Sequence, residues 1–379
     1  MKAMRLIVAV VLTAFLVVSF SAPVFAQAGK EPVRIGVFLP MTGGVASYGQ
    51  MEWAGIQVAN QMKPTVLGRP VELILVDEKS DRIEAANAVD RLISRNRVHA
   101  IIGTATSSNT MAAAPIAEKA RVPIVSPTAT DPRVTQNRKY TFRVCFIDPF
   151  QGEVAARFAF NNLKARRAAL LIDRAQDYCV DLANFFRNSF VKMGGRIVQT
   201  TYCQTGDQDF TAQLSAIMAT KPDVLYLPNY YAEDALICKQ AAELGMKVTI
   251  MSADGAQAPE LIKIGGKAVE GFLLTGHFEK EGAATKLAKQ YIRNYESRFK
   301  TDASGFDALG ADAYFILIDA MERAKSAEGP KVRAALAKTR KFGGVSGVIN
   351  IGEDGNAVKS MVILQVKDGK FRYLATVNP

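Results

Sequence analysis

The chain has 379 residues, of which 49% are hydrophobic and 22% are charged, and its formal net charge is +11. This composition is typical of a globular protein of about two domains and excludes a disordered or fibrous chain. The Lys and Arg residues are scattered rather than gathered on one segment with interleaved aromatic residues, so the charge does not indicate a nucleic-acid partner.

The first 26 residues have the layout of a secretory signal peptide. Lys2 and Arg5 precede the apolar run LIVAVVLTAFLVVSF, which leads to a small-residue site ending at Ala26. An uncleaved membrane anchor is the alternative, but the run is short. No cysteine follows it closely enough to carry a lipid, and no later run reaches the ~20 residues needed to cross a bilayer. We expect cleavage after Ala26 and an exported soluble protein.

Strand and helix patterns alternate in the first half of the chain. Strands are predicted at 33–40, 71–78, 100–103 and 122–126, and helices at 52–62, 82–96 and 109–120, where apolar residues recur at spacings of three and four. This β-α-β-α order predicts a parallel sheet with helices on both faces.

The same alternation restarts near residue 146. Helices are predicted at 150–163, 180–194, 210–219 and 234–245, and strands at 168–173, 196–202, 224–228, 248–252 and 271–276. A helical pair is predicted from 284 to 337, and an antiparallel hairpin with Asp-Gly turns from 348 to 375. One sheet of ordinary size does not hold so many parallel strands, so we predict an α/β fold of two doubly wound lobes.

The ends of the predicted strands carry polar residues suited to binding. Ligands of open parallel sheets bind beyond the carboxyl ends of the strands. The segments found there, such as TATSSN, PTATDP, NYYAED and ADGAQ, are rich in Ser, Thr, Tyr and Asp and poor in His, Cys and Lys. No GxSxG, GxxxxGK[ST] or HExxH motif is present. We therefore expect a binding protein that uses no cofactor, rather than an enzyme.

Two of these segments could hold the two ends of a zwitterion. Ser107 and Ser108 begin a predicted helix, where free N–H groups and the helix dipole favour an anion; the alternative is that one of them is only an N-cap. Asp254 could accept hydrogen bonds from an ammonium group, although an Asp-Gly after a strand is often only a turn. Four tyrosines could line the pocket with aromatic faces: Tyr48, Tyr178, Tyr230 and Tyr231. This pairing of charges suggests an amino acid.

The four cysteines are Cys145, Cys179, Cys203 and Cys238. None has a paired spacing with another cysteine or with either of the two histidines, so no metal site is expected. Cys179 and Cys203 each follow a predicted strand, and a disulfide between them is possible in an exported protein if those strands are neighbours. Free buried thiols are the default expectation.

Four segments together resemble the Leu/Ile/Val-binding protein family: VRIGVFLPMTGGVASYGQ, AIIGTATSSNTMAAAPIAEKARVPIVSPTATDP, GDQDFTAQLSAI and MSADG. These are type I periplasmic substrate-binding proteins of branched-chain amino acid ABC transporters, and the resemblance covers nearly the whole mature chain. It implies two lobes joined by three crossovers that close on the ligand. Lobe 1 would hold residues 27–147 and 276–352, and lobe 2 residues 148–275 and 353–379.

The resemblance also implies roles for individual residues. Ser107 and Thr130 match positions that bind the α-carboxylate of the ligand, with Thr128 contributing backbone, and Asp254 matches an acidic position that holds the α-ammonium group. Pocket positions of the family fall at Tyr48, Tyr178, Tyr230 and Phe306. The chain departs from the family at Asp254, where Glu is frequent, and at Thr106, where some members have a cysteine.

The implied function is that of a periplasmic receptor, expected to be monomeric, that delivers an amino acid to a membrane ABC permease. An aliphatic or branched-chain side chain is the main expectation. The same fold could instead bind an amide, a urea or an aromatic acid, although those branches would be expected to lack the acidic ammonium partner. A sensory ligand-binding protein that signals through a partner is a further alternative.

Overall fold

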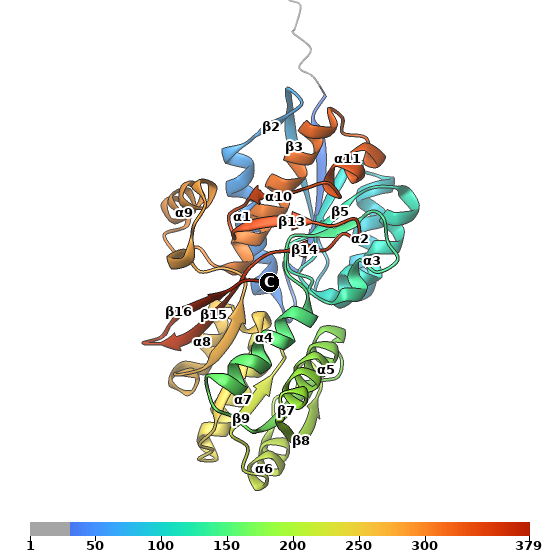
Figure 1. Cartoon of the computed structure of the whole chain (residues 1–379). Helices are drawn as coiled ribbons and strands as arrows, with labels where there is room; N and C mark the ends of the chain where they lie inside the picture. Colours follow the sequence, from blue (N-terminus) through green and yellow to red (C-terminus); the bar gives the residue numbers. More distant parts are fainter. Residues whose placement is uncertain (1–30) are drawn as a thin grey trace, which may run out of the picture.

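The computed structural model describes residues 31–379, which form two α/β lobes placed one above the other (Figure 1). The expected signal peptide and its cleavage after Ala26 lie outside the described residues. No helix within residues 31–379 is both long enough and apolar enough to cross a membrane. The prediction of two doubly wound lobes is confirmed.

The first lobe is built on a six-stranded sheet with the order β2-β3-β1-β4-β5-β6. Its strands are β1 (Val33–Leu39), β2 (Thr65–Val66), β3 (Arg69–Asp77), β4 (Ala100–Gly103), β5 (Ile124–Ser126) and β6 (Thr141–Arg143). All neighbours are parallel except β2 and β3. Helices α2 (Arg82–Ser94) and α3 (Ser107–Ala120) bury one face of the sheet, and α1 (Ala46–Met62) and α10 (Gly305–Ala324) bury the other.

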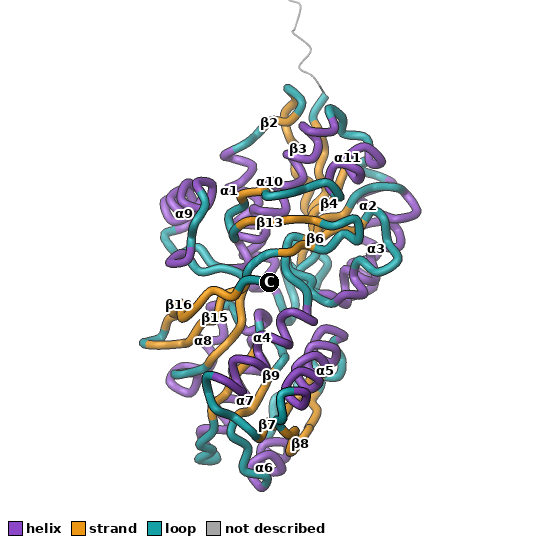
Figure 2. Tube along the Cα trace, in the orientation of Figure 1, coloured by secondary structure: helices purple, strands orange, loops and turns teal. Residues whose placement is uncertain are grey.

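The second lobe is built on a seven-stranded sheet with the order β16-β15-β11-β10-β9-β7-β8. Its strands are β7 (Arg167–Asp173), β8 (Arg196–Cys203), β9 (Val224–Leu227), β10 (Thr249–Ser252), β11 (Leu273–Gly276), β15 (Met361–Lys367) and β16 (Lys370–Val377). Its helices are α4 (Asp148–Asn161), α5 (Asp177–Lys192), α6 (Thr211–Ala219), α7 (Tyr231–Glu243) and α8 (Pro259–Gly265). Figure 2 shows these helices on both sides of the strands, as the alternating sequence predicts.

Two expectations for the last third of the chain need correction. The expected helical pair is three helices, α9 (Lys286–Phe299), α10 and α11 (Gly329–Leu336), because the chain turns at Lys300 and Lys325 with φ of 58° and 49°. The expected hairpin is two separate pairings. Strand β13 (Val348–Ile351) pairs with β14 (Ala357–Val358), and β15 pairs with β16. Strand β14 therefore pairs across the boundary expected after residue 352.

The chain passes between the lobes three times, after β6, after β11 and after β14 (Figure 1). Strand β14 also belongs to a small third sheet, in the order β12-β13-β14, whose first strand is β12 (Phe342–Gly343). These crossovers agree with the expected architecture, while the residue limits of the lobes stay predictions.

The disulfide considered between Cys179 and Cys203 is absent. Strands β7 and β8 are neighbours, and Cys203 pairs with Asp173, but Cys179 lies in the first turn of α5 and both cysteines are free thiols in the core of the lobe. Burial raises the pKa of both thiols above the usual range. Cys145 and Cys238 are likewise buried and free.

Helices α1 and α10 touch backbone to backbone. A Cβ atom on Gly55 would lie 1.9 Å from the carbonyl oxygen of Asp307, and one on Gly310 would lie 2.4 Å from that of Glu52. No residue with a side chain fits at either position without moving a helix. Both glycines therefore fix how closely these helices pack.

Candidate functional site

One cavity lies between the lobes, with an empty volume of about 230 Å³ that includes the part open to solvent. It is lined by Tyr48, Ala105, Thr106, Ser107, Thr128, Thr130, Tyr178, Tyr230, Asp254, Gly255 and Phe306. Eight of the ten residues expected at the site are in this group; Ser108 and Tyr231 are not. A wider hollow, with an empty volume of about 1080 Å³ including its part open to solvent, lies along the crossovers and the C-terminus, and none of the ten lines it.

The first lobe supplies unpaired donors at one end of the cavity. Ser107 Oγ accepts a hydrogen bond from the Asp131 N–H at 3.1 Å, so its own O–H remains free to donate. The hydroxyl of Thr130 is buried and has no hydrogen-bond partner in the described chain, although the Asp148 carboxyl is nearby. The first N–H groups of α3 are also unpaired within the helix. This end is suited to a carboxylate.

Two other side chains hold these donors in place. Arg143 is fully buried, and its Nη1 and Nη2 donate to the carbonyls of Ala129 and Asp131 at 2.6 and 2.8 Å. Glu52 Oε1 accepts from Thr128 Oγ1 at 2.6 Å. Burial raises the pKa of Glu52 to about 8, so the group is mostly protonated at neutral pH and adds little negative charge near this end.

The structure places Ser108 outside the cavity. Its Oγ accepts from Arg82 Nη2 at 3.1 Å and donates to Asp177 Oδ2 at 2.9 Å, so it has no free donor for a ligand. The N-cap alternative for Ser107 or Ser108 is also wrong. Thr106 is the N-cap of α3, with φ −97° and ψ 145°, and its side chain makes no capping bond.

The second lobe supplies a carboxylate to the same cavity. Asp254 follows β10 and is 3% exposed. Its Oδ1 accepts from Gln151 Nε2 at 2.7 Å and from Tyr178 OH at 2.8 Å, and its Oδ2 lies 2.9 Å from His277 Nε2. Three neutral donors therefore hold a buried carboxylate that lines the cavity without a protein cation on it.

Gln151 and His277 were missed as site residues by sequence reasoning. His277 directly follows β11, the same kind of position that drew attention to Asp254. Gln151 lies inside α4, where nothing in the pattern distinguishes it from other helix residues.

Two stacked aromatic pairs form the walls of the cavity. Tyr48 stacks on Phe306 in the first lobe with ring centroids 4.3 Å apart, and Tyr178 stacks on Tyr230 in the second at 5.6 Å. The two walls meet where the rings of Tyr48 and Tyr230 contact each other edge to face, with their centroids 5.7 Å apart. Tyr231 does not line the cavity; its hydroxyl donates to the Gly44 carbonyl across the cleft at 3.1 Å.

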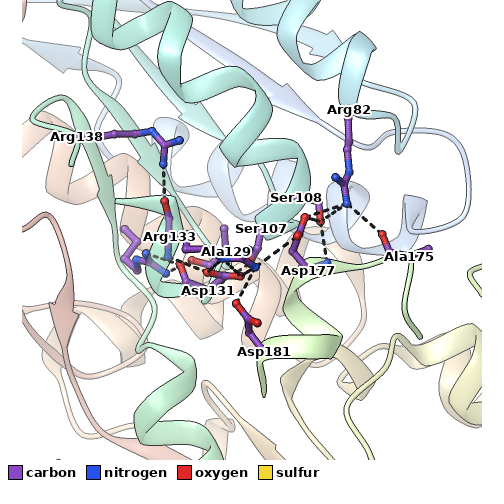
Figure 3. A network of polar contacts seen from close by, with 11 residues as sticks. Arg82, Ser107, Ser108, Ala129, Asp131, Arg133, Arg138, Ala175, Asp177 and Asp181 are labelled. Atoms are coloured by element: carbon purple, nitrogen blue, oxygen red, sulfur yellow. Dashed lines mark hydrogen bonds and ion pairs between the residues drawn. The ribbon is translucent and has the colours of Figure 1, made fainter. Parts of the chain in front are cut away.

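Direct contacts between the lobes show that the structure is the closed form. The Tyr48 hydroxyl donates to the Gly255 carbonyl and the Ser47 hydroxyl to Glu260. Beside the cavity, four charged residues form what we call the cross-lobe network (Figure 3): Arg82, Arg133, Asp177 and Asp181. Arg82 lies 2.9 Å from Asp177, and Arg133 lies 2.7 Å from Asp181.

The arrangement suits a small zwitterion with an apolar side chain. Neutral donors from the first lobe and one carboxylate from the second line the same cavity, together with aromatic rings. Among residues 31–379, no group of three or more His, Cys, Asp or Glu side chains is placed to hold a metal ion.

Comparison with known proteins agrees with this geometry. Residues 32–370 match the model of a family described as periplasmic binding protein. The chain belongs to this family. The family consists of binding proteins rather than enzymes, as expected from the polar strand ends.

Three relatives with stated names cover nearly the whole chain. The crystal structure of the leucine binding protein LivK from Thermotoga maritima is 49% identical, with a TM-score of 0.90 over 92% of this chain and 99% of that one. The LivJ protein from Streptococcus pneumoniae, a branched-chain amino acid transporter substrate binding protein solved with isoleucine, is 30% identical, with a TM-score of 0.87 over 92% and 100%. The Leu/Ile/Val-binding protein BraC3 of Rhizobium johnstonii is 28% identical over 91% of this chain and 93% of its own.

Proposed function

We propose that this chain is the periplasmic binding component of an ABC importer and carries an aliphatic, branched-chain amino acid to its permease. In this proposal the protein acts as an exported monomer. The ligand lies between the lobes, and the closed form is the one that the permease recognises.

One observation carries the proposal: Asp254 lines, as a buried carboxylate, the same cavity as the hydroxyls of Ser107 and Thr130, which are free to donate. An α-amino acid carries its ammonium and carboxylate groups on the same carbon, and such a ligand can pair with Asp254 and with the hydroxyls at once. Burying Asp254 without a cation is costly, and a ligand ammonium group would offset that cost. The names of LivK, LivJ and BraC3 support the same class of ligand.

The walls support an apolar side chain. The rings of Tyr48, Phe306, Tyr178 and Tyr230 line the cavity and stack in two pairs. A charged side chain would meet no partner of opposite sign among the lining residues once Asp254 holds the ammonium group.

A thermal-shift screen of the mature protein tests the proposal. The panel contains the twenty amino acids, small amides, urea and aromatic acids, each at millimolar concentration. Leucine, isoleucine or valine should raise the Tm by several degrees, because a ligand stabilises the folded state in proportion to the logarithm of its concentration over Kd. Stabilisation by an aromatic acid or an amide, with none by amino acids, would refute the proposal.

A further inference from the structure

The carboxylate of Asp254 already has one internal partner that can become a cation. His277 Nε2 lies 2.9 Å from Asp254 Oδ2, and the side chain of His277 is 0% exposed. The imidazole stacks on Phe146, with ring centroids 4.1 Å apart. His277 directly follows β11, at the second of the three crossovers.

In its neutral form the imidazole positions the carboxylate. An ionised Asp254 only accepts hydrogen bonds, so Nε2 must carry the proton of a neutral His277. The other ring nitrogen, Nδ1, is buried and has no hydrogen-bond partner in the described chain. Because Gln151 and Tyr178 both donate to Oδ1, His277 is the only one of the three that fixes Oδ2.

A protonated His277 would place a positive charge on the same carboxylate that a ligand ammonium group needs. We infer that His277 is a positioning residue for Asp254 and that its protonation competes with the cationic group of the ligand, so that acid weakens amino-acid binding. This inference rests on the proposed function, because it requires a ligand that carries an ammonium group.

The surrounding groups set the pH range of the effect. Burial lowers the pKa of His277 below its usual 6.5, Asp254 opposes that shift, and Lys359 reinforces it. Asp254 in turn helps to raise the pKa of Asp148 and Cys145, which lie at the segment that leads into α4, although burial is the main cause for both. An added ammonium group would lower the histidine pKa further. By linkage, the affinity is full above this pKa and falls as pH drops through it, by up to about tenfold per pH unit.

Two substitutions separate positioning from protonation. His277→Gln keeps an N–H near the Nε2 position but cannot take up a proton, whereas His277→Ala removes the donor. The test is to measure the Kd for leucine by calorimetry from pH 4 to 7.5 for the native protein and both variants. At pH 7.5 we expect His277→Gln to bind within about threefold of the native protein, and His277→Ala to bind at least tenfold more weakly. Below pH 6.5 the native protein should lose affinity more steeply than His277→Gln.

The only other histidine of the chain provides the matched control. His99 lies on the far side of the first lobe, where its Nδ1 contacts the backbone of Arg34, and His99→Gln should keep the native pH profile. With two histidines, NMR titration resolves each pKa, and leucine should lower that of His277 alone. A ligand that lacks the ammonium group, 4-methylpentanoate, should bind better at low pH. This pH dependence is the opposite of the one expected for leucine.

The outcomes separate this inference from the function on which it rests. If His277→Gln shows the native pH profile, or if His277→Ala binds leucine as well as the native protein at pH 7.5, the inference is overturned and the function stands. If the native protein binds no amino acid at pH 7.5, the proposed function is refuted, and with it the inference that rests on it.

Discussion

The guanidinium of Arg133 in the first lobe lies 2.7 Å from the carboxylate of Asp181 in the second lobe. Arg133 is also paired with Asp131 of its own lobe at 2.6 Å, so it is held in position before the lobes meet. The contact is half-exposed, with 43% and 30% of the two side chains accessible. It therefore favours the closed form modestly, and salt screens it.

Asp181→Asn should weaken ligand binding without touching the cavity. Pairs of this exposure contribute roughly 0.2–1 kcal/mol, which corresponds to a roughly 1.4- to fivefold higher Kd for leucine in 20 mM NaCl. The difference from the native protein should shrink in 300 mM NaCl. The matched control is Glu153→Gln, which removes a carboxylate paired with Arg157 within α4. An equal effect of both substitutions would contradict a role for the cross-lobe network.

Asp254→Asn should remove most of the affinity for amino acids while the fold stays intact. Losing one partner of a buried charge pair costs about 2–5 kcal/mol, so the Kd for leucine should rise at least thirtyfold by calorimetry. Asp234→Asn is the control, because Asp234 is a buried carboxyl of the same lobe that bonds to Ser252 outside the cavity. If the Asp254→Asn variant binds leucine with unchanged affinity, Asp254 does not bind the ammonium group of the ligand.

Thr130→Val should weaken binding while leaving the stability of the free protein almost unchanged. The lost hydroxyl has no hydrogen bond of good geometry within the described chain, although it lies close to the Asp148 carboxyl, whereas a hydrogen bond to a charged ligand group is worth about 1.5–3 kcal/mol. We expect at least a tenfold higher Kd for leucine. Thr141→Val removes a similarly buried, unpaired hydroxyl from β6, away from the cavity. If both variants bind leucine equally well, Thr130 does not contact the ligand.

Glu52→Gln should make the protein more stable than the native one at pH 8 and not at pH 4. Burial raises the pKa of Glu52 from 4.5 to about 8, so between these pH values the folded state holds a proton that the unfolded state has released. This group's contribution to stability is therefore lost as pH rises through that range, by about 1.4 kcal/mol for each pKa unit. Urea unfolding at both pH values measures the difference. Glu153→Gln, an exposed change, should show no such trend.

The periodicity of the sequence predicted the two-lobed fold well because parallel strands buried on both faces form short apolar runs. It failed at 284–337, where Lys300 and Lys325 end helices in left-handed conformations that carry no Gly or Pro signal. The pairing of β13 with β14 was also missed, since two consecutive hairpins share the same alternation as one.

For the site, strand ends and family resemblance selected the residues that meet in one cavity, because chain topology brings strand ends together. The orientation of side chains could not be predicted in the same way. Ser107 and Ser108 are adjacent, yet one lines the cavity and the other bonds to Asp177. Gln151 contacts Asp254 from a helix 103 positions away in sequence, a distance that local patterns do not encode.

The glycine contacts between α1 and α10 have a consequence for ligand capture. Tyr48 stands near the start of α1 and Phe306 near the start of α10, and their rings stack. Because the two helices touch through Gly55 and Gly310, neither ring can shift along its helix axis without moving the other helix. The two stacked rings therefore move together as one rigid unit when the lobes close. The shape of that wall is therefore set before any ligand arrives, and selection among side chains takes place against a preformed surface.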